Sequence, residues 1–308
     1  MADNHSIRSD DVIKTVAYFD VFKYPLTDEQ IYRFLPRNSV TKEYVSDIVK
    51  RLVADGILDE YNNYYFLRSE GREIVSQRKD NEKRAQKMLK YARLVSLLLK
   101  QFPFTRAIFI TGALSKNVAV ADSDIDFMIV TAKERLWICK TFLTLFRKVF
   151  LLGSHKYFCT NFYVSEKEYT ISERNMYSAI ELLTTKVMWN IPAFLEFQQA
   201  NSWAKDFLPN CTPSIDSTVV LSPSRSLVQR FIERVLNFFP LAAMNRFLMN
   251  RYKRHWEKLY HDLAEEQRET SFHTSPNIAT VWKTDYQALI LEQCKEKLSK
   301  LGLEELYD

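Results

Sequence analysis

Two short apolar runs near the middle of the chain restrict its fold more than any other feature. They are AIFIT at 107–111 and IDFMIVT at 125–131, both rich in β-branched residues and separated by a loop. Short runs of this composition are typical of strands, whereas most of the remaining chain has helical periodicity. A third segment, YFCTNFYVS at 157–165, alternates between polar and apolar residues as a strand should. Together they predict a small mixed sheet within an α+β chain.

Length and composition set the frame around this sheet. The chain has 308 residues, of which 46% are hydrophobic and 26% charged. A single domain usually has about 100 to 200 residues, so we expect two or three globular units rather than disorder. The polar N-terminus and the lack of a long apolar run argue against a signal peptide or a membrane span. The four cysteines have no metal-ligand spacing, and together these features predict a cytoplasmic protein.

The first 70 residues have the signals of three helices and a hairpin. Apolar residues recur at helical spacing over 9–22, and Thr27 with Gln30 forms a capping-box pattern for a short second helix. A third helix is expected from Thr41 to Ala54, and β-prone stretches at 57–60 and 64–67 follow. This order predicts a winged-helix-like domain over residues 1–70.

The predicted third helix carries a nearly balanced set of charges. A helix that reads DNA needs basic and polar side chains that reach phosphates and base edges. Three basic residues here are opposed by three acids; they are Lys42, Lys50 and Arg51 against Glu43, Asp47 and Asp55. We therefore favour a structural or protein-contacting role for this unit over DNA binding.

The rest of the chain divides into three further segments by pattern. Helical periodicity with a solvated charge run predicts a linking helix over 71–103. The strand-forming segments define a catalytic core over 104–170. Nearly everything after residue 173 looks helical apart from prolines, so we expect a helical C-terminal domain over 171–308.

Two aspartates, Asp124 and Asp126, sit at the start of the second apolar run. Residues two apart in a strand point to the same face, so the carboxylates should lie side by side while Ile125 enters the core. Like charges this close oppose folding unless a cation or a donor compensates them. Mg²⁺ is commonly held by one or two carboxylates together with substrate phosphates. The pair therefore suggests a phosphate substrate.

Gly112 strengthens this interpretation. It follows the first apolar run and is the only glycine between Gly71 and Gly153. A glycine turn lets the backbone approach a phosphate closely and offers N–H groups as donors. A D-x-D triplet alone is weak evidence of a site, but its combination with a strand, a glycine turn and a second strand is more specific.

This combination resembles the nucleotidyltransferase superfamily typified by DNA polymerase β. The matching residues are Gly112-Ala113, a spacer from Leu114 to Ser123, and then Asp124-Ile125-Asp126. The resemblance covers residues 105–165, about a fifth of the chain. It implies transfer of a nucleoside monophosphate from an NTP to an acceptor hydroxyl with release of pyrophosphate.

The resemblance also implies a set of site residues. Asp124 and Asp126 would hold Mg²⁺ or Mn²⁺, and the loop at Gly112 would contact the phosphates. The other candidate nucleotide-binding positions in this loop are Ala113, Ser115, Lys116 and Ser123. Ala113 stands where the superfamily usually has Ser or Gly, so Thr111 or Ser115 would have to supply a hydroxyl.

A second departure concerns the third carboxylate, which active members usually place on a later strand. The matching strand here carries Asn161, which we include among the catalytic candidates. An amide can coordinate or hydrogen-bond but cannot act as a general base near neutral pH. Glu181, in a following helix, could replace it. The alternative is a weak or inactive relative that regulates by binding nucleotide, nucleic acid or protein, including a toxin–antitoxin component. The acceptor stays open between RNA, DNA, a protein and a small molecule.

A basic stretch over 225–258 is the other feature with functional content. It has eight Lys or Arg against two acids, within a chain of net charge +5. Its apolar residues Leu227, Phe231, Val235 and Phe239 recur at a four-residue spacing. We expect this helix to pack on the catalytic core, and contact with a polyanion or an anionic membrane surface is the second interpretation.

Overall fold

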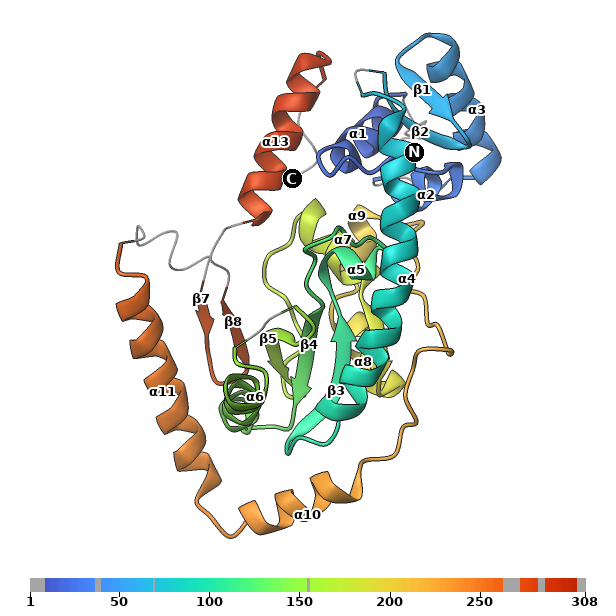
Figure 1. The fold of residues 1–308 in the computed structure, drawn as a ribbon. Coiled ribbons are helices and arrows are strands. Elements are labelled where there is room, and N and C mark those ends of the chain that lie inside the picture. Colours follow the sequence, from blue (N-terminus) through green and yellow to red (C-terminus); the bar gives the residue numbers. More distant parts are fainter. Residues whose placement is uncertain are drawn as a thin grey trace, which may run out of the picture.

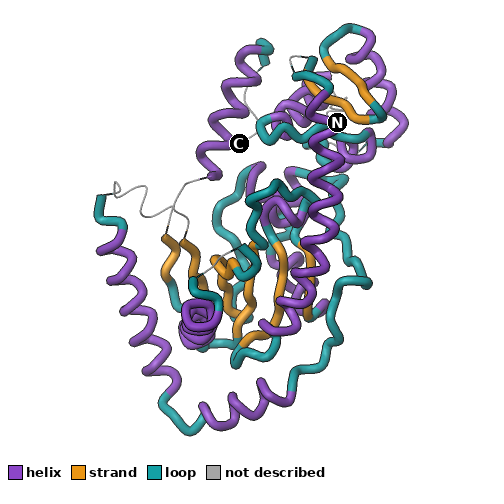
Figure 2. The backbone as a smooth tube through the Cα atoms, viewed as in Figure 1, coloured by secondary structure: helices purple, strands orange, loops and turns teal. Residues whose placement is uncertain are grey.

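The computed structural model describes residues 9–36, 40–68, 70–153, 156–262, 272–281 and 286–303. Helices and strands are interleaved along the chain (Figure 1, Figure 2). The helices are α1 (Ser9–Asp20), α2 (Asp28–Arg33), α3 (Lys42–Ala54), α4 (Glu73–Leu99), α5 (Gly112–Ser115), α6 (Leu136–Phe150), α7 (Met176–Thr184), α8 (Ile191–Ala200), α9 (Ala204–Phe207), α10 (Leu227–Leu236), α11 (Leu241–Leu259) and α13 (Tyr286–Lys300). The strands are β1 (Leu58–Tyr61), β2 (Tyr64–Leu67), β3 (Thr105–Ile110), β4 (Asp126–Thr131), β5 (Cys159–Ser165), β6 (Lys186–Trp189), β7 (Phe272–Thr274) and β8 (Ile278–Val281). Among the described residues, no helix has both the length and the low polarity needed to cross a bilayer.

The N-terminal helices and hairpin follow the predicted order. Thr27 and Gln30 form the capping box of α2, with Thr27 Oγ1 accepting from Gln30 N at 3.3 Å and Gln30 Oε1 accepting from Thr27 N at 3.0 Å. The turn between β1 and β2 places Asn62 and Asn63 at φ 54 and 64. Asparagine tolerates this left-handed conformation, which a tight hairpin turn requires. The winged-helix assignment itself stays a prediction.

The larger sheet is mixed, as predicted. Its strand order is β6-β3-β4-β5-β8-β7. β4 and β5 are parallel, and the other neighbours are antiparallel. The α6 helix connects the parallel pair, because a parallel crossover cannot be made by a tight turn.

The prediction that the chain is helical beyond residue 171 is wrong. β6 pairs with β3, and β7 and β8 extend the opposite edge of the sheet beyond β5. The sheet therefore crosses the expected boundary at residue 170. These strands have three or four residues each, and a segment that short shows no reliable periodicity. Their pairing depends on long-range backbone hydrogen bonds that sequence pattern does not reveal.

Helices cover both faces of the sheet. Ala107 and Phe109 of β3 belong to a core shared with α7 and α8, whereas Ile108 and Ile110 belong to a core shared with α4 and α6. Figure 1 shows α4 running along one side of the sheet to the N-terminal helices. Burial on both faces explains why β3 and β4 are continuous apolar runs.

The α10 helix lies against the start of β3, but with the face opposite to the one that the apolar pattern of the basic stretch predicts. Leu227 and Phe231 are 78% and 68% exposed, whereas Gln229 and Glu233 are buried. The helix thus turns a polar face to the body of the protein. The cause is a set of hydrogen bonds from this face to the start of β3, described below.

Candidate functional site

A sharp turn at Gly112 follows β3 and leads into α5. Gly112 has φ +67, and a Cβ added there would lie 2.7 Å from Oδ2 of Asp126. Both the left-handed backbone and the close carboxylate therefore require glycine. Thr111 N donates to the carbonyl oxygen of Asp126 at 3.1 Å, which fixes the turn against the start of β4.

Asp126 and Asn161 lie next to each other near the first residues of the neighbouring strands β4 and β5. Along the β4–β5 ladder, Phe127 pairs with Thr160 and Met128 pairs with Phe162. Asn161 is the extra residue of this bulge, and bulges redirect side chains. Its Nδ2 donates to Oδ1 of Asp126 at 3.2 Å. Its own Oδ1 is buried and has no hydrogen-bond donor among the described residues.

Asp124 differs from the expectation that both acids lie on one strand. It is exposed and precedes β4, which begins at Asp126, although Ile125 is fully buried as predicted. The Ile125 N–H donates to the carbonyl oxygen of Lys156 at 3.0 Å and so holds the segment against the loop before β5. The strand β4 therefore begins one residue later than the apolar pattern indicates.

The electrostatics of Asp126 are those of a crowded acid. Burial raises its pKa to about 6, and the negative charges of Asp124 and Glu181 add to this effect. Hydrogen bonds from Cys159 and Asn161 act in the opposite direction but do not cancel it. The charges of Asp124 and Glu181 thus act on a largely buried carboxylate.

Glu181 of α7 occupies the donors of the glycine turn. Its Oε2 accepts from Gly112 N at 3.1 Å, and its Oε1 accepts from Lys116 Nζ at 2.5 Å. Lys116 Nζ also donates to the carbonyl oxygen of Gly112 at 3.1 Å. The turn therefore binds an anion, which in this conformation is the protein's own carboxylate.

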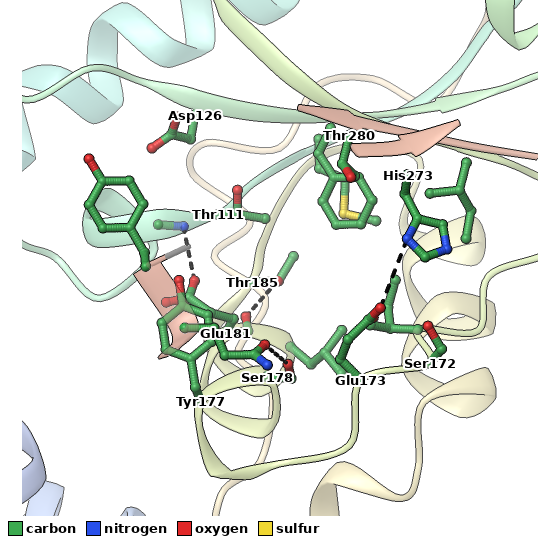
Figure 3. A pocket seen from close by; sticks show the side chains of 18 of the residues that line it. Thr111, Asp126, Ser172, Glu173, Tyr177, Ser178, Glu181, Thr185, His273 and Thr280 are labelled. Carbon is green, nitrogen blue, oxygen red and sulfur yellow. Dashed lines mark hydrogen bonds and ion pairs between the residues drawn. The ribbon is translucent and has the colours of Figure 1, made fainter. Parts of the chain in front are cut away.

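A cavity of about 220 Å³ opens beside these groups. Gly112 contributes to its lining. Asp126 and Glu181 line it as well and are labelled in Figure 3. Glu173 and His273 line it as well, with Oε1 of Glu173 4.0 Å from Nδ1 of His273, and Figure 3 shows this pair across the cavity from Asp126. Helix α13 adds Tyr286 and Gln287 to the lining.

Sequence reasoning missed the lining contributed by Glu173, His273 and Tyr286. These residues lie far from the D-x-D segment in the chain, and nothing in their spacing links them to it. The pairing of β7 and β8 with the edge of the sheet brings His273 to the cavity, whereas Glu173 comes from the loop before α7 and Tyr286 from α13. No local signal could have found them.

The remaining predicted loop residues have structural contacts. Ser115 Oγ donates to the carbonyl oxygen of Gly112 at 2.7 Å, and Ser123 Oγ accepts from Val120 N at 2.9 Å. The carbonyl oxygen of Ala113 accepts from the backbone of Lys116 at 3.0 Å. The described lining of the cavity includes Gly112 and Asp126 but not these loop residues, Asp124 or Asn161.

The described residues contain no group of three or more His, Cys, Asp or Glu placed to hold a metal ion. Comparison of the chain with protein-family models, with curated proteins and with solved structures finds no match. The interpretation of the site therefore depends on its own geometry.

Proposed function

We propose that the chain is a Mg²⁺-dependent nucleotidyltransferase that moves a nucleoside monophosphate from an NTP to an acceptor hydroxyl. One observation carries the proposal: the Gly112 turn, Asp126 and Asn161 are in contact at the end of a mixed sheet, and a cavity opens beside them. The two metal-ligand candidates are Asp124 and Asp126. Mn²⁺ could replace Mg²⁺, since both prefer oxygen ligands.

The donor set fits a hard divalent cation. Asp124 and Asp126 supply carboxylates. Asn161 has a buried amide oxygen without a donor among the described residues, and it would join them once the amide, whose Nδ2 now donates to Asp126, turns over. Mg²⁺ is usually bound by one or two carboxylates, with water and substrate phosphates completing its shell. When bound, the cation neutralises charge on the transferring phosphate. Its charge would also oppose the effects of burial, and of the smaller repulsion from Asp124 and Glu181, that raise the pKa of Asp126.

The turn supplies the groups that would hold the phosphates. The N–H of Gly112 and the ammonium of Lys116 already bind the carboxylate of Glu181. Phosphate oxygens have the same charge and hydrogen-bonding character as this carboxylate. A triphosphate would therefore compete with Glu181, which has to release the turn before the nucleotide binds.

A second candidate function is nucleotide binding without transfer. Asn161 favours it, because an amide beside Asp126 cannot take a proton from an acceptor hydroxyl. Pyrophosphate release from each NTP, with RNA offered as acceptor, distinguishes the two functions. Release by the wild type supports transfer, whereas release only by Asn161→Asp supports a binding protein that lacks the base.

Calorimetry with each of the four NTPs, with and without Mg²⁺, tests the site without knowledge of the acceptor. We expect Mg²⁺-dependent binding that weakens at least about tenfold in Asp124→Asn/Asp126→Asn. The neighbouring exposed Asp122 provides the matched control Asp122→Asn, which should bind as the wild type does. Absence of NTP binding by the wild type would contradict the proposal.

Glu181→Gln extends the same experiment. The amide keeps the size of the side chain but gives up the charge that holds Lys116, so the triphosphate meets a weaker competitor. We expect NTP affinity to rise about tenfold, the scale of one charge-assisted hydrogen bond. Weaker binding in Glu181→Gln would mean that Glu181 assists the nucleotide rather than competing with it.

A further inference from the structure

The α10 helix has its apolar face outside and its polar face inside. Six large apolar residues of α10 and of the turn that follows are exposed; they are Leu227, Val228, Phe231, Val235, Phe238 and Phe239. On a helical wheel, those of α10 fall on one side. A surface helix normally turns such a stripe to the core. We call these six residues the outer stripe.

Polar contacts explain why α10 is held this way round. Gln229 Nε2 donates to the carbonyl oxygens of Phe102 and Thr105 at 3.0 and 2.7 Å. Glu233 accepts from the backbone N–H of Phe104 at 2.6 Å and from the guanidinium of Arg106 at 2.9 Å. These groups are buried and satisfied, so rotating the helix to bury its outer stripe would break them all.

The charge beside the outer stripe is positive. Arg230 and Arg234 are exposed on α10 at its border. The one acid of this helix, Glu233, is neutralised by Arg106 and Arg225. The next helix, α11, is basic along its own length; its exposed basic residues are Arg246, Arg251, Lys253, Arg254 and Lys258, against the single acid Glu257. An apolar stripe bordered by arginines is the pattern of a helix that lies in the surface of an anionic bilayer.

Other occupants fit this surface less well. A second copy of the chain would bring one arginine border against another, and like charges oppose such a contact. Single-stranded RNA would satisfy the arginines, but the stripe includes the aliphatic residues Leu227, Val228 and Val235, on which bases do not stack. A bilayer accepts aliphatic and aromatic side chains alike and supplies phosphate groups for the arginines.

We propose that the outer stripe of α10 inserts into the surface of an anionic lipid bilayer, with Arg230 and Arg234 on the lipid phosphates. Figure 1 shows α10 at the end of the molecule opposite the N-terminal helices, so a bilayer could contact it without meeting α1–α3. The surface is separate from the nucleotide site, and the proposal stands or fails independently of that function.

Cosedimentation of the full chain with lipid vesicles tests the proposal. We expect binding to vesicles of phosphatidylcholine mixed with phosphatidylglycerol, little binding to phosphatidylcholine alone, and weakening by salt. Phe231→Ser/Phe238→Ser should lower the partition coefficient more than about tenfold, because two rings no longer insert. Leu195→Ser, at a 54% exposed position on α8, is the matched control and should bind as the wild type does.

A charge-reversal pair tests the arginines separately. Arg230→Glu/Arg234→Glu should lower binding to anionic vesicles more than about tenfold. Lys87→Glu/Lys90→Glu makes the same change at exposed positions on α4 and should have a much smaller effect. Thermal melts of all four variants check that each one folds, which we expect because every altered side chain is exposed.

Three outcomes would overturn the proposal. The first is failure of the wild type to sediment with anionic vesicles. The second is RNA binding, measured by fluorescence anisotropy, that the α10 variants abolish while vesicle binding is absent or unchanged. The third is a dimer in solution that Phe231→Ser/Phe238→Ser dissociates without any vesicle binding, which would assign the stripe to a second copy.

Discussion

Helices α3 and α10 are both amphipathic and both begin with a side-chain cap, yet they face opposite ways. Thr41 caps α3, which buries Val45, Ile48, Val49 and Leu52. Ser226 caps α10, which buries Gln229 and Glu233 and exposes Leu227 and Phe231. Periodicity thus defines two faces of a helix, but the partners available in the fold decide which face is inside. Burial of the polar face is stable here because its groups are fully paired.

Among the changes that test this comparison, we expect Glu233→Ala to have the largest effect on stability. Burial alone would raise the pKa of Glu233, but the hydrogen bonds from Arg106 and from Phe104 N hold it below its usual value. Removing the carboxylate leaves the mostly buried guanidinium of Arg106 without its main partner. We expect the free energy of unfolding to fall by about 4 kcal/mol in urea titrations. A loss no larger than that of the exposed control Glu292→Ala would mean that the ion pairs do not hold α10.

A matched pair of truncations sharpens the comparison. Ile48→Ala on α3 removes a side chain that is 2% exposed and should cost about 3 kcal/mol through the cavity it leaves. Phe231→Ala removes a larger side chain that is mostly in solvent and should change stability by less than about 0.5 kcal/mol. Thermal unfolding of the two variants gives the contrast directly. A cost above about 2 kcal/mol for Phe231→Ala would mean that the stripe is buried in the free protein.

Lys140 of α6, beneath α11, gives a smaller and pH-dependent effect. Unlike Glu233 it faces aromatic rings, with its Nζ 4.3 Å from the ring centroid of Tyr163 and 5.4 Å from that of Trp256. Burial lowers its pKa from 10.5 to about 7, and the positive charge of Arg147 adds to the shift. Between these values the folded protein binds fewer protons than the unfolded chain, so stability should rise with pH above 7.

The measurement is the free energy of unfolding at pH 7, 8 and 9. We expect Lys140 to contribute a rise of up to about 1.4 kcal/mol per pH unit, which Lys140→Met should abolish. Lys87→Met, at an exposed position on α4, should keep the slope. The measurement stops at pH 9 because burial raises the pKa of Cys139 and Cys159 from 9.0 to about 12. Above pH 9 these thiols ionise in the unfolded chain but not in the folded protein, which lowers stability as the pH rises. An unchanged slope in Lys140→Met would contradict the assignment.

Local signals in the sequence predicted much of the architecture. The capping box at Thr27 formed as expected because it joins groups three residues apart, and α3 begins directly after Thr41, where a helix start was expected. β3 and β4 were recognisable because strands buried on both faces need apolar residues, and β5 because its polar and apolar residues alternate. The glycine at position 112 was singled out because little else suits a turn with a positive φ. That this turn binds nucleotide phosphates stays a proposal.

Tertiary structure decided the features that join distant segments. β6, β7 and β8 are too short for their sequences to show the periodicity of a strand. They form by pairing at the edges of the sheet. The cavity forms because the fold places Glu173 and His273 across from Asp126. The bulge in β5 directs the side chain of Asn161 to Asp126. The orientation of α10 depended on carbonyl oxygens at Phe102 and Thr105.

The sequence by itself determined the N-terminal helices, the three central strands and the residues that share a face within each, because those properties arise from groups a few residues apart. It did not determine which face of α10 is buried or what surrounds Asp126. Both depend on hydrogen bonds and charges contributed by segments that are distant in the chain. These contacts form, and contribute to stability, only when folding brings the segments together.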